Sequence, residues 1–247
     1  MERLFSRRRF LKSAIALTAA ANFAGADAAE DAPKGSRVIV TGGHPGDPEY
    51  GCGGTIARLT SAGSDVLLLY LNEGEPELQS PRLPKGTRVA EAEKACEILR
   101  ARPAFAGQID GNAIIDKSHY EHFRGIVAAE RPDAVFTHWP IDNHADHRAI
   151  FMLAYDAWVR LGKKFALFYY EVSNGEDTVQ FAPTQYVGIS AVEGKKRAAC
   201  YAHASQSPDK FYALQDSVAR WRGMESGQGR AEAFIHHAQS PAFALPL

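Results

Sequence analysis

The hydrophobic positions of this chain follow two patterns that alternate from residue 38 onward. Short runs of consecutive Val, Leu, Phe and Tyr have the length and composition of strands that are covered on both faces. Between them, apolar residues recur at spacings of three and four, which is typical of helices with one buried face. The expected strands are 38–41, 66–71, 134–137 and 165–170, and the expected helices are 54–62, 88–100, 120–130 and 146–160.

This alternation predicts an α/β fold that is Rossmann-like, with a mainly parallel sheet and helices on both faces. We expect it to form a single domain over residues 36–247, because a chain of 247 residues that is 45% hydrophobic can bury one substantial core. The helical pattern returns after Gly194, where we interpret Lys195, Lys196 and Arg197 as a solvent-facing group.

Two strings that contain histidine follow predicted strands directly. His44-Pro45-Gly46-Asp47 follows the first, and His144-Ala145-Asp146-His147 follows the third. Open α/β sheets collect their ligands at the carboxyl ends of their strands, so we expect the two strings to lie close together. Zinc takes imidazole nitrogen and carboxylate oxygen, and a catalytic site uses three protein ligands with water in the fourth position. The sequence therefore predicts Zn2+ bound by His44, Asp47 and His147.

The two other polar residues of the second string are candidates for catalysis. We expect His144 to donate a hydrogen bond to a developing oxyanion. Asp146 is expected to hold an imidazole in one tautomer, as carboxylates near metal ligands commonly do. Scattered surface histidines with a capping aspartate are the alternative interpretation, and it requires two such strings to share one structural context by chance.

The first residues indicate export. Ser6-Arg7-Arg8-Arg9-Phe10-Leu11-Lys12 has the form of a twin-arginine signal, and the apolar stretch 14–17 and the small residues 26–28 follow it. We expect a signal peptide over 1–28, a linker over 29–35 and a periplasmic or extracellular protein. An uncleaved anchor is the alternative, although the apolar stretch is short for a span of ~20 residues. No later segment has the pattern of a membrane span.

The amino-acid composition indicates which kind of molecule the protein binds. The formal net charge of -1 gives no electrostatic reason to expect nucleic acid, so we expect a small-molecule partner. Three cysteines are too few, and odd in number, for a disulfide framework. The sequence does not decide the oligomeric state, and a homo-oligomer is compatible with it.

The two strings belong to a longer set of motifs that resembles the PIG-L/LmbE-type zinc deacetylases and spans nearly all of residues 36–247. The set is His44-Pro45-x-Asp47, Gly51-Cys52-Gly53-Gly54-Thr55-Ile56, Asn72-Glu73-Gly74-Glu75, Arg88-x-x-Glu91 and Pro140-x-Asp142-x-His144-x-Asp146-His147. The resemblance implies a Rossmann-like sheet, bound zinc and removal of an acetyl group from an N-acetylglucosamine unit of a small molecule.

The resemblance also assigns roles to individual residues. It implies that His44, Asp47 and His147 hold the zinc, that His144 stabilises the oxyanion and that Arg88 contacts the substrate. A helix-surface arginine paired with Glu91 is the alternative for Arg88.

One position departs from the family pattern. The family string is His-Pro-Asp-Asp, whose first aspartate acts as the general base, and this chain has Gly46 there. General acid–base help is typically worth ~10²- to 10⁴-fold in rate, so another carboxylate must take this role for efficient turnover. We expect Asp142 to do so, with a turn-forming or metal-supporting role as its alternative. Further candidates for the base are Glu49, Glu73 and Glu75.

Gly46 also leaves a second function open, a catalytically impaired, zinc-containing carbohydrate-binding protein. A nucleotide-binding Rossmann protein is a third interpretation, but Gly51-x-Gly53 does not continue into the G-x-G-x-x-G fingerprint. We expect a zinc-dependent N-deacetylase, because the predicted ligands occur together with His144 and Asp146.

Overall fold

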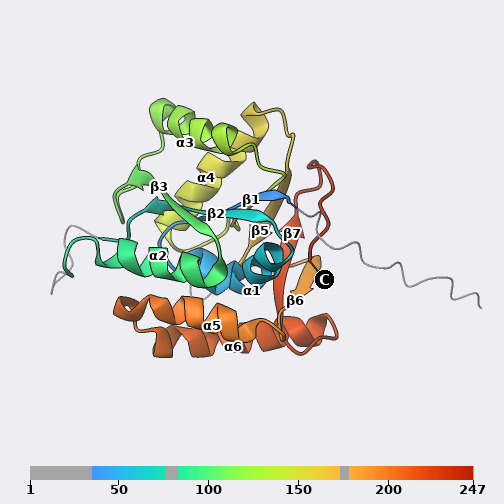
Figure 1. The fold of residues 1–247 in the computed structure, drawn as a ribbon. Coiled ribbons are helices and arrows are strands. Elements are labelled where there is room, and N and C mark those ends of the chain that lie inside the picture. The colour runs from blue at the N-terminus through green and yellow to red at the C-terminus, as the bar shows by residue number, and fades with distance from the viewer. Residues whose placement is uncertain (1–34, 76–82, 173–177, 247) are drawn as a thin grey trace, which may run out of the picture.

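A twisted sheet runs through the centre of the molecule, with helices packed on both of its faces (Figure 1). The computed structural model describes residues 35–75, 83–172 and 178–246. The signal peptide expected over 1–28 and most of the expected linker lie outside the described residues. Within them, the strands are β1 (Arg37–Gly42), β2 (Asp65–Asn72), β3 (Arg102–Gln108), β4 (Ala134–His138), β5 (Ala166–Tyr170), β6 (Gln185–Gly188) and β7 (Ala231–His236).

The sheet has the order β3-β2-β1-β4-β5-β7-β6. Strands β1 to β5 are parallel to one another, and β7 is antiparallel to both β5 and β6. The prediction of a mainly parallel, Rossmann-like sheet is therefore confirmed. The chain moves outward from β1 through β2 to β3 and then returns to add β4 on the other side of β1. The carboxyl ends of β1 and β4 thus lie side by side at the switch point, where α/β sheets bind ligands.

Helices pack on both faces of the sheet, in one layer on one side and in two on the other. They are α1 (Asp47–Ser61), α2 (Thr87–Leu99), α3 (Lys117–Glu130), α4 (Ala145–Arg160), α5 (Glu193–Ala202) and α6 (Pro208–Glu225), with a short 3-10 turn η1 (Ala204–Gln206) before the last. Helices α3 and α4 cover one face of the sheet, whereas α1 and α2 cover the other and are themselves covered by α5 and α6 (Figure 1). Of the helices in the described segments, none is long and apolar enough to span a membrane.

The central strands are buried because their residues serve two cores. Val38 and Val40 of β1 pack in the core beneath α1 and α2, and Ile39 between them packs in the core beneath α3 and α4. Alternate side chains of a strand point to opposite faces, so a strand covered on both faces is apolar throughout. This explains why a continuous apolar run was the correct signal for β1, β2, β4 and β5.

The interpretation of the basic run on α5 is wrong for one of its three residues. Lys195 and Arg197 are exposed, but Lys196 is buried and its Nζ lies 2.6 Å from Glu232 Oε1. Helix α5 packs against α1 and α2, so one side of the basic run faces the protein interior. The same Glu232 carboxylate accepts a hydrogen bond from the backbone of α1 at Gly54.

Candidate functional site

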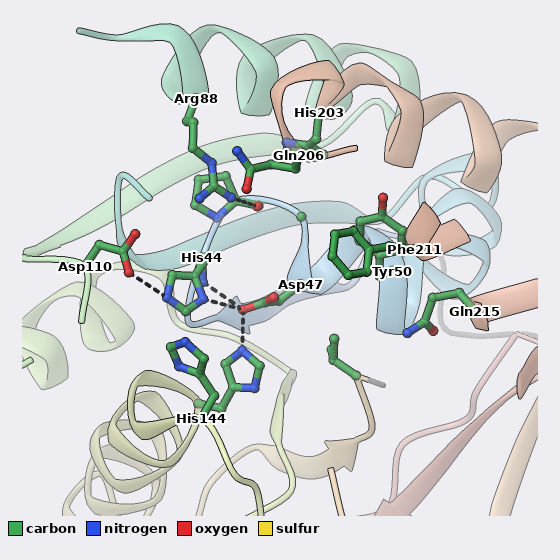
Figure 2. Close-up of a pocket in the computed structure, with 14 residues that line it drawn as sticks. His44, Asp47, Tyr50, Arg88, Asp110, His144, His203, Gln206, Phe211 and Gln215 are labelled. Carbon is green, nitrogen blue, oxygen red and sulfur yellow. Dashed lines mark hydrogen bonds and ion pairs between the residues drawn. The ribbon is translucent and has the colours of Figure 1, made fainter. Parts of the chain in front are cut away.

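A cavity of about 300 Å³ opens where the carboxyl ends of β1 and β4 meet (Figure 2). Both histidine strings contribute to its wall, so the predicted convergence of the two strand ends is confirmed. The lining residues are His44, Pro45, Gly46, Asp47, Tyr50, Arg88, Asp110, His144, His147, Val172, His203, Gln206, Phe211 and Gln215.

Glycines make the close approach of the two strings feasible. A Cβ atom at Gly43 would lie 2.8 Å from the ring of His147, so only glycine allows the β1 loop to pass this close. Gly46 caps the amino end of α1 with φ of 114°, in the region that L side chains rarely adopt. The glycine that departs from the family string therefore occupies a backbone conformation suited to glycine.

Asp47 is the centre of the site. Its Oδ2 atom lies 3.4 Å from His44 Nδ1, 3.2 Å from His147 Nε2 and 3.4 Å from His138 Nε2. The backbone N–H of His44 also donates to this oxygen, at 2.8 Å. The three residues predicted as metal ligands thus direct one oxygen and two nitrogens at a common region, as Figure 2 shows for His44 and Asp47.

The outer nitrogen of each predicted imidazole ligand faces a carboxylate. His44 Nε2 lies 3.1 Å from Asp146 Oδ2 and 3.1 Å from Asp110 Oδ1, and His147 Nδ1 lies 3.1 Å from Asp142 Oδ1. Carboxylates placed in this way fix the tautomer and the orientation of metal-binding imidazoles. With the outer N–H donating to a carboxylate, the inner nitrogen is the one that can bind a divalent cation when its proton is displaced. Among the described residues, the groups of three whose ligand atoms lie within 4.8 Å of one another include His44-His144-His147 and Asp47-His138-His147.

The pKa shifts of the ionisable groups in the site also favour a bound cation. Burial alone would raise the pKa of Asp47, but the charge of His147 and hydrogen bonds from the histidines hold it well below its ordinary value. Burial alone would lower the pKa of His147, but Asp47 and Asp142 raise it to about 9. The pKa of His44 is likewise raised well above its ordinary value, against burial, by hydrogen bonds to Asp110 and other carboxylates. The carboxylates therefore favour positive charge here, which a metal ion supplies when it displaces the protons.

His144 has a defined tautomer. It caps the amino end of α4, where its Nδ1 accepts a hydrogen bond from the backbone N–H of Asp146 at 3.2 Å. Burial and the neighbouring imidazoles lower the pKa of His144, so the ring is neutral and its proton is on Nε2. A neutral Nε2–H on the cavity wall can donate to an oxyanion, as the sequence predicts for this residue.

Asp142 and Asp146 do not line the cavity. Asp142 lies behind His147, where it accepts hydrogen bonds from the backbone N–H of His144 at 2.8 Å and from Thr178 Oγ1 at 3.0 Å. Asp146 is 1% exposed and lies behind His44, where Asn72 also donates to it. Both acids are therefore placed to orient the histidines.

Arg88 lines the cavity, and its guanidinium is hydrogen-bonded to backbone carbonyl groups of the protein. Its guanidinium donates to the carbonyl oxygens of Gly74 at 2.8 Å and Pro45 at 2.7 Å, which ties two loops of the site together. The alternative surface pair with Glu91 is wrong, because Glu91 accepts hydrogen bonds from the backbone and the hydroxyl of Ser205, each at 2.7 Å.

Sequence reasoning missed about half of the cavity wall. Asp110 follows β3, an element that the hydrophobic pattern did not predict. His138, a titratable residue that the sequence places at a strand end, does not line the cavity. It is fully buried and stacks on His147 with ring centroids 4.0 Å apart, and burial together with the charge of His147 lowers its pKa to about 4. Tyr50 of α1 and Val172, which follows β5, were also missed. Four further lining residues come from the chain after α5. They are His203, Gln206, Phe211 and Gln215.

Comparison with known proteins agrees with this geometry. Residues 39–158 match the model of the PIG-L family, described as GlcNAc-PI de-N-acetylase. The chain is similar to the diacetylchitobiose deacetylase of Thermococcus kodakarensis, with 28% identity over 217 residues that cover 79% of this chain and 81% of the relative.

Solved structures share the fold. The conserved protein TT1542 from Thermus thermophilus has 28% sequence identity and a TM-score of 0.71, over 84% of this chain and 100% of that one. GalB, the 4-carboxy-2-hydroxymuconate hydratase from Pseudomonas putida, has 20% identity and a TM-score of 0.72, over 84% and 98% of the two chains. Since a hydratase shares the fold, the reaction has to be argued from the site.

Proposed function

This chain contains a PIG-L family domain, and from that premise we propose that it is a zinc-dependent N-deacetylase. Such an enzyme is a hydrolase of carbon–nitrogen bonds other than peptide bonds, and its substrate here is an N-acetylglucosamine-type small molecule or glycoconjugate. One observation carries the proposal: His44 Nδ1 and His147 Nε2 both face Asp47 Oδ2, each with a carboxylate behind the ring. The similarity to a diacetylchitobiose deacetylase supports the substrate class.

His44, Asp47 and His147 would hold the zinc. Bound there, the ion would polarise the acetamide carbonyl and lower the pKa of a water molecule. His144 Nε2–H donates to the carbonyl oxygen as negative charge develops on it, and loss of one such donor typically costs ~10²- to 10³-fold in rate. Asp142 and Asp146 orient the two histidines from behind. Arg88 keeps the loops that carry Pro45 and Gly74 in place at the substrate side of the cavity.

The proposed reaction also needs a general base that accepts a proton from water. Asp142, which the sequence analysis favours, has its two oxygens engaged by His144, His147 and Thr178. We therefore propose that Asp142 positions His147. Gly46 itself supplies no proton acceptor, and this observation favours the second candidate function, a zinc-containing carbohydrate-binding protein with impaired turnover.

Zinc content and acetate release test both candidates. We expect one zinc per chain by metal analysis and acetate release from an N-acetylglucosamine conjugate by the zinc-loaded protein. The double variant His44→Ala, His147→Ala should lose both, while His122→Ala, on the exposed surface of α3, should keep both. Full zinc content in the double variant would contradict the ligand assignment. Binding of the conjugate without acetate release would favour the binding protein.

A further inference from the structure

The outermost helix of the molecule carries a line of apolar side chains that points away from the protein. Helix α6 lies at the edge of the fold opposite α3, and its inner side packs against α5 and β7 (Figure 1). Leu214, Trp221 and Met224 of α6 are 40%, 55% and 68% exposed. Their spacings of seven and three place them on one side of the helix, and we call them the α6 stripe. Large apolar side chains grouped in this way mark an interaction surface.

The α6 stripe is arranged so that it complements a second copy of itself. In a two-fold, antiparallel pair of identical helices, two residues face each other when they lie equally far from the midpoint of the contact. With the midpoint between Ser217 and Val218, Leu214 of one copy faces Trp221 of the other. The same register brings Lys210 opposite Glu225 at each end of the contact.

The charges at the two ends of the α6 stripe are opposite and exposed. Among the described residues Lys210 has no ion pair, and its Nζ lies 5.0 Å from the centroid of the Phe211 ring. Glu225 is ionised at neutral pH, because a hydrogen bond from Arg222 lowers its pKa. Opposite charges across a contact fix its register and its choice of partner. The α6 stripe therefore has both the apolar centre and the complementary ends that self-association needs.

A second apolar line, on α4, lacks this complementarity. Met152, Tyr155 and Val159 are 45%, 36% and 39% exposed. Exposed cations lie beyond both ends of the line, at Arg148 and at Lys163. An antiparallel contact between two copies of α4 would set these cations against each other, which opposes association. Exposed apolar residues alone thus do not single out α6, whereas its charge pattern does.

We propose that the α6 stripe is the contact surface between two copies of this chain, which associate with their α6 helices antiparallel. Helix α6 has 18 residues, so it is roughly 27 Å long. A contact along one helix of this length buries less than the ~1,600 Å² of a standard interface, and we expect a Kd on the order of micromolar. This association does not depend on the reaction proposed above.

Sedimentation velocity of the full-length protein, from about 1 to about 100 µM, tests the association. We expect the wild type to pass from monomer to dimer as its concentration rises. Met224→Glu puts a charge into the contact and should keep the protein monomeric over this range. Met152→Glu makes the same change on α4 and should associate like the wild type.

A charge exchange tests the pairing of Lys210 with Glu225. Lys210→Glu turns an attractive pair into a repulsive one at each end of the contact, so we expect it to raise the Kd about tenfold. The double variant Lys210→Glu, Glu225→Lys restores opposite charges and should bring the Kd back towards that of the wild type. A double variant that associates no better than Lys210→Glu would overturn the register.

A new cysteine near the two-fold axis tests the same register. The chain's own cysteines, Cys52, Cys96 and Cys200, are buried. Ser217→Cys therefore adds an exposed thiol at the centre of the contact, and mild oxidation should link two copies through it. Ser118→Cys, exposed on α3, is the control and should stay unlinked.

Other outcomes would overturn the proposal. They are a wild type that is monomeric at every concentration, and a dimer that Met224→Glu leaves intact. A third is a monomer whose fluorescence shifts to shorter wavelength on anionic lipid vesicles and no longer does so as Trp221→Phe, since the α6 stripe would then contact membranes. All substitutions are at exposed positions, and a wild-type melting temperature confirms that each variant is folded. If Met224→Glu does not fold, Lys210→Glu and its charge exchange decide the question.

Discussion

The tautomer and the orientation of each histidine in this site depend on the groups that face its two ring nitrogens. The imidazole of His147 meets Asp47 on one side and Asp142 on the other, and that of His44 meets Asp47 and Asp146. An imidazole held between two carboxylates donates from its outer nitrogen to one of them, and its inner nitrogen can bind a metal when the metal displaces the proton there. The same logic makes His144 a donor, because the backbone of α4 occupies its Nδ1.

Asp142→Asn separates the two roles considered for this residue. As a positioning residue, Asp142 keeps His147 in the metal-binding tautomer, and its neutral variant should bind zinc ~10- to 100-fold more weakly. Activity should then return largely at saturating zinc. As the general base, its loss would leave zinc affinity unchanged and abolish acetate release. Competition with a chelator gives the affinity, and acetate release in excess zinc gives the turnover.

At the scale of elements, helix α1 is capped at its amino end by a residue in an unusual backbone conformation. Gly46 has φ of 114°, while the nearest atoms to a Cβ added there are 3.6 Å away, on Tyr50. A side chain therefore fits, but the backbone would be strained by ~1–3 kcal/mol. We expect Gly46→Asp to supply the missing carboxylate and raise acetate release, and at the same time to lower the free energy of unfolding.

Chemical denaturation and the deacetylase assay measure the two effects of Gly46→Asp separately. Gly125→Ala is the control, because Gly125 lies within α3 at negative φ with no atom within 4 Å of an added Cβ. That substitution should be neutral or slightly stabilising. Unchanged activity of Gly46→Asp would place the base at another residue, and unchanged stability would mean that the loop relaxes around it.

The layer between α1 and α5 depends on the buried pair of Lys196 and Glu232. Burial lowers the pKa of Lys196, but the charge of Glu232 outweighs it, so the pKa in the folded protein lies above the ordinary 10.5. Folding therefore favours the protonated amine. The stabilisation is complete below pH 10.5 and is lost as the pH rises through the higher folded pKa.

Lys196→Met should remove this dependence on pH. At neutral pH it leaves Glu232 buried without a partner, which typically costs ~3–5 kcal/mol. The difference in unfolding free energy between wild type and variant should stay constant up to about pH 10 and should shrink as the pH rises above 10.5, since the wild-type lysine loses its proton only there. Lys195→Met, at the exposed neighbouring position, should parallel the wild type throughout. A constant difference over this range would exclude the linkage.

The elements that the sequence predicted and those that it missed differ in burial. Strands β1, β2, β4 and β5 are covered on both faces and are read directly from continuous apolar runs. β3 lies at the sheet edge, is only partly buried and contains Pro103, which an edge strand tolerates. β6 has four residues. The first four residues of β7 are buried, but its apolar run is only three residues long, because Glu232 precedes it and His236 follows it. Asp110 was missed because it follows β3.

The candidate site shows the same division. His44, Asp47, His144 and His147 lie in two short strings whose spacing carries chemical information, so a sequence can reveal them. Phe211 and Gln215 reach the cavity only because α5 and α6 fold back over α1 and α2. No local pattern encodes that packing, so the sequence could not predict this part of the cavity wall.

At the scale of the whole molecule, the expected export signal and the candidate metal site lead to one joint prediction. We propose that Arg7 and Arg8 direct export by the twin-arginine route, which carries folded proteins, so that zinc can be bound before export. The double variant Arg7→Lys, Arg8→Lys should accumulate inside the cell, as cell fractionation would show. Unchanged export of this variant would contradict the proposal.

Zinc should also stabilise the fold as a whole. His44 and Asp47 follow β1, and His147 lies on α4, which follows β4, so the ion would join the segments that follow two adjacent parallel strands. A ligand that binds only the folded state at 100 times its Kd adds ~2.7 kcal/mol of stability. When the metal is removed, only protons on the neighbouring histidines balance the negative charges of Asp47, Asp142 and Asp146. We therefore expect Tm to fall on chelation.

Calorimetry before and after chelation measures this shift, and the addition of zinc should reverse it. His44→Ala, His147→Ala should melt at one temperature with and without zinc, because it lacks the site. His122→Ala should behave like the wild type. A Tm that responds to zinc in the double variant would mean that the stabilising ion is bound elsewhere. The link between metal and stability would then be separate from the site at the switch point.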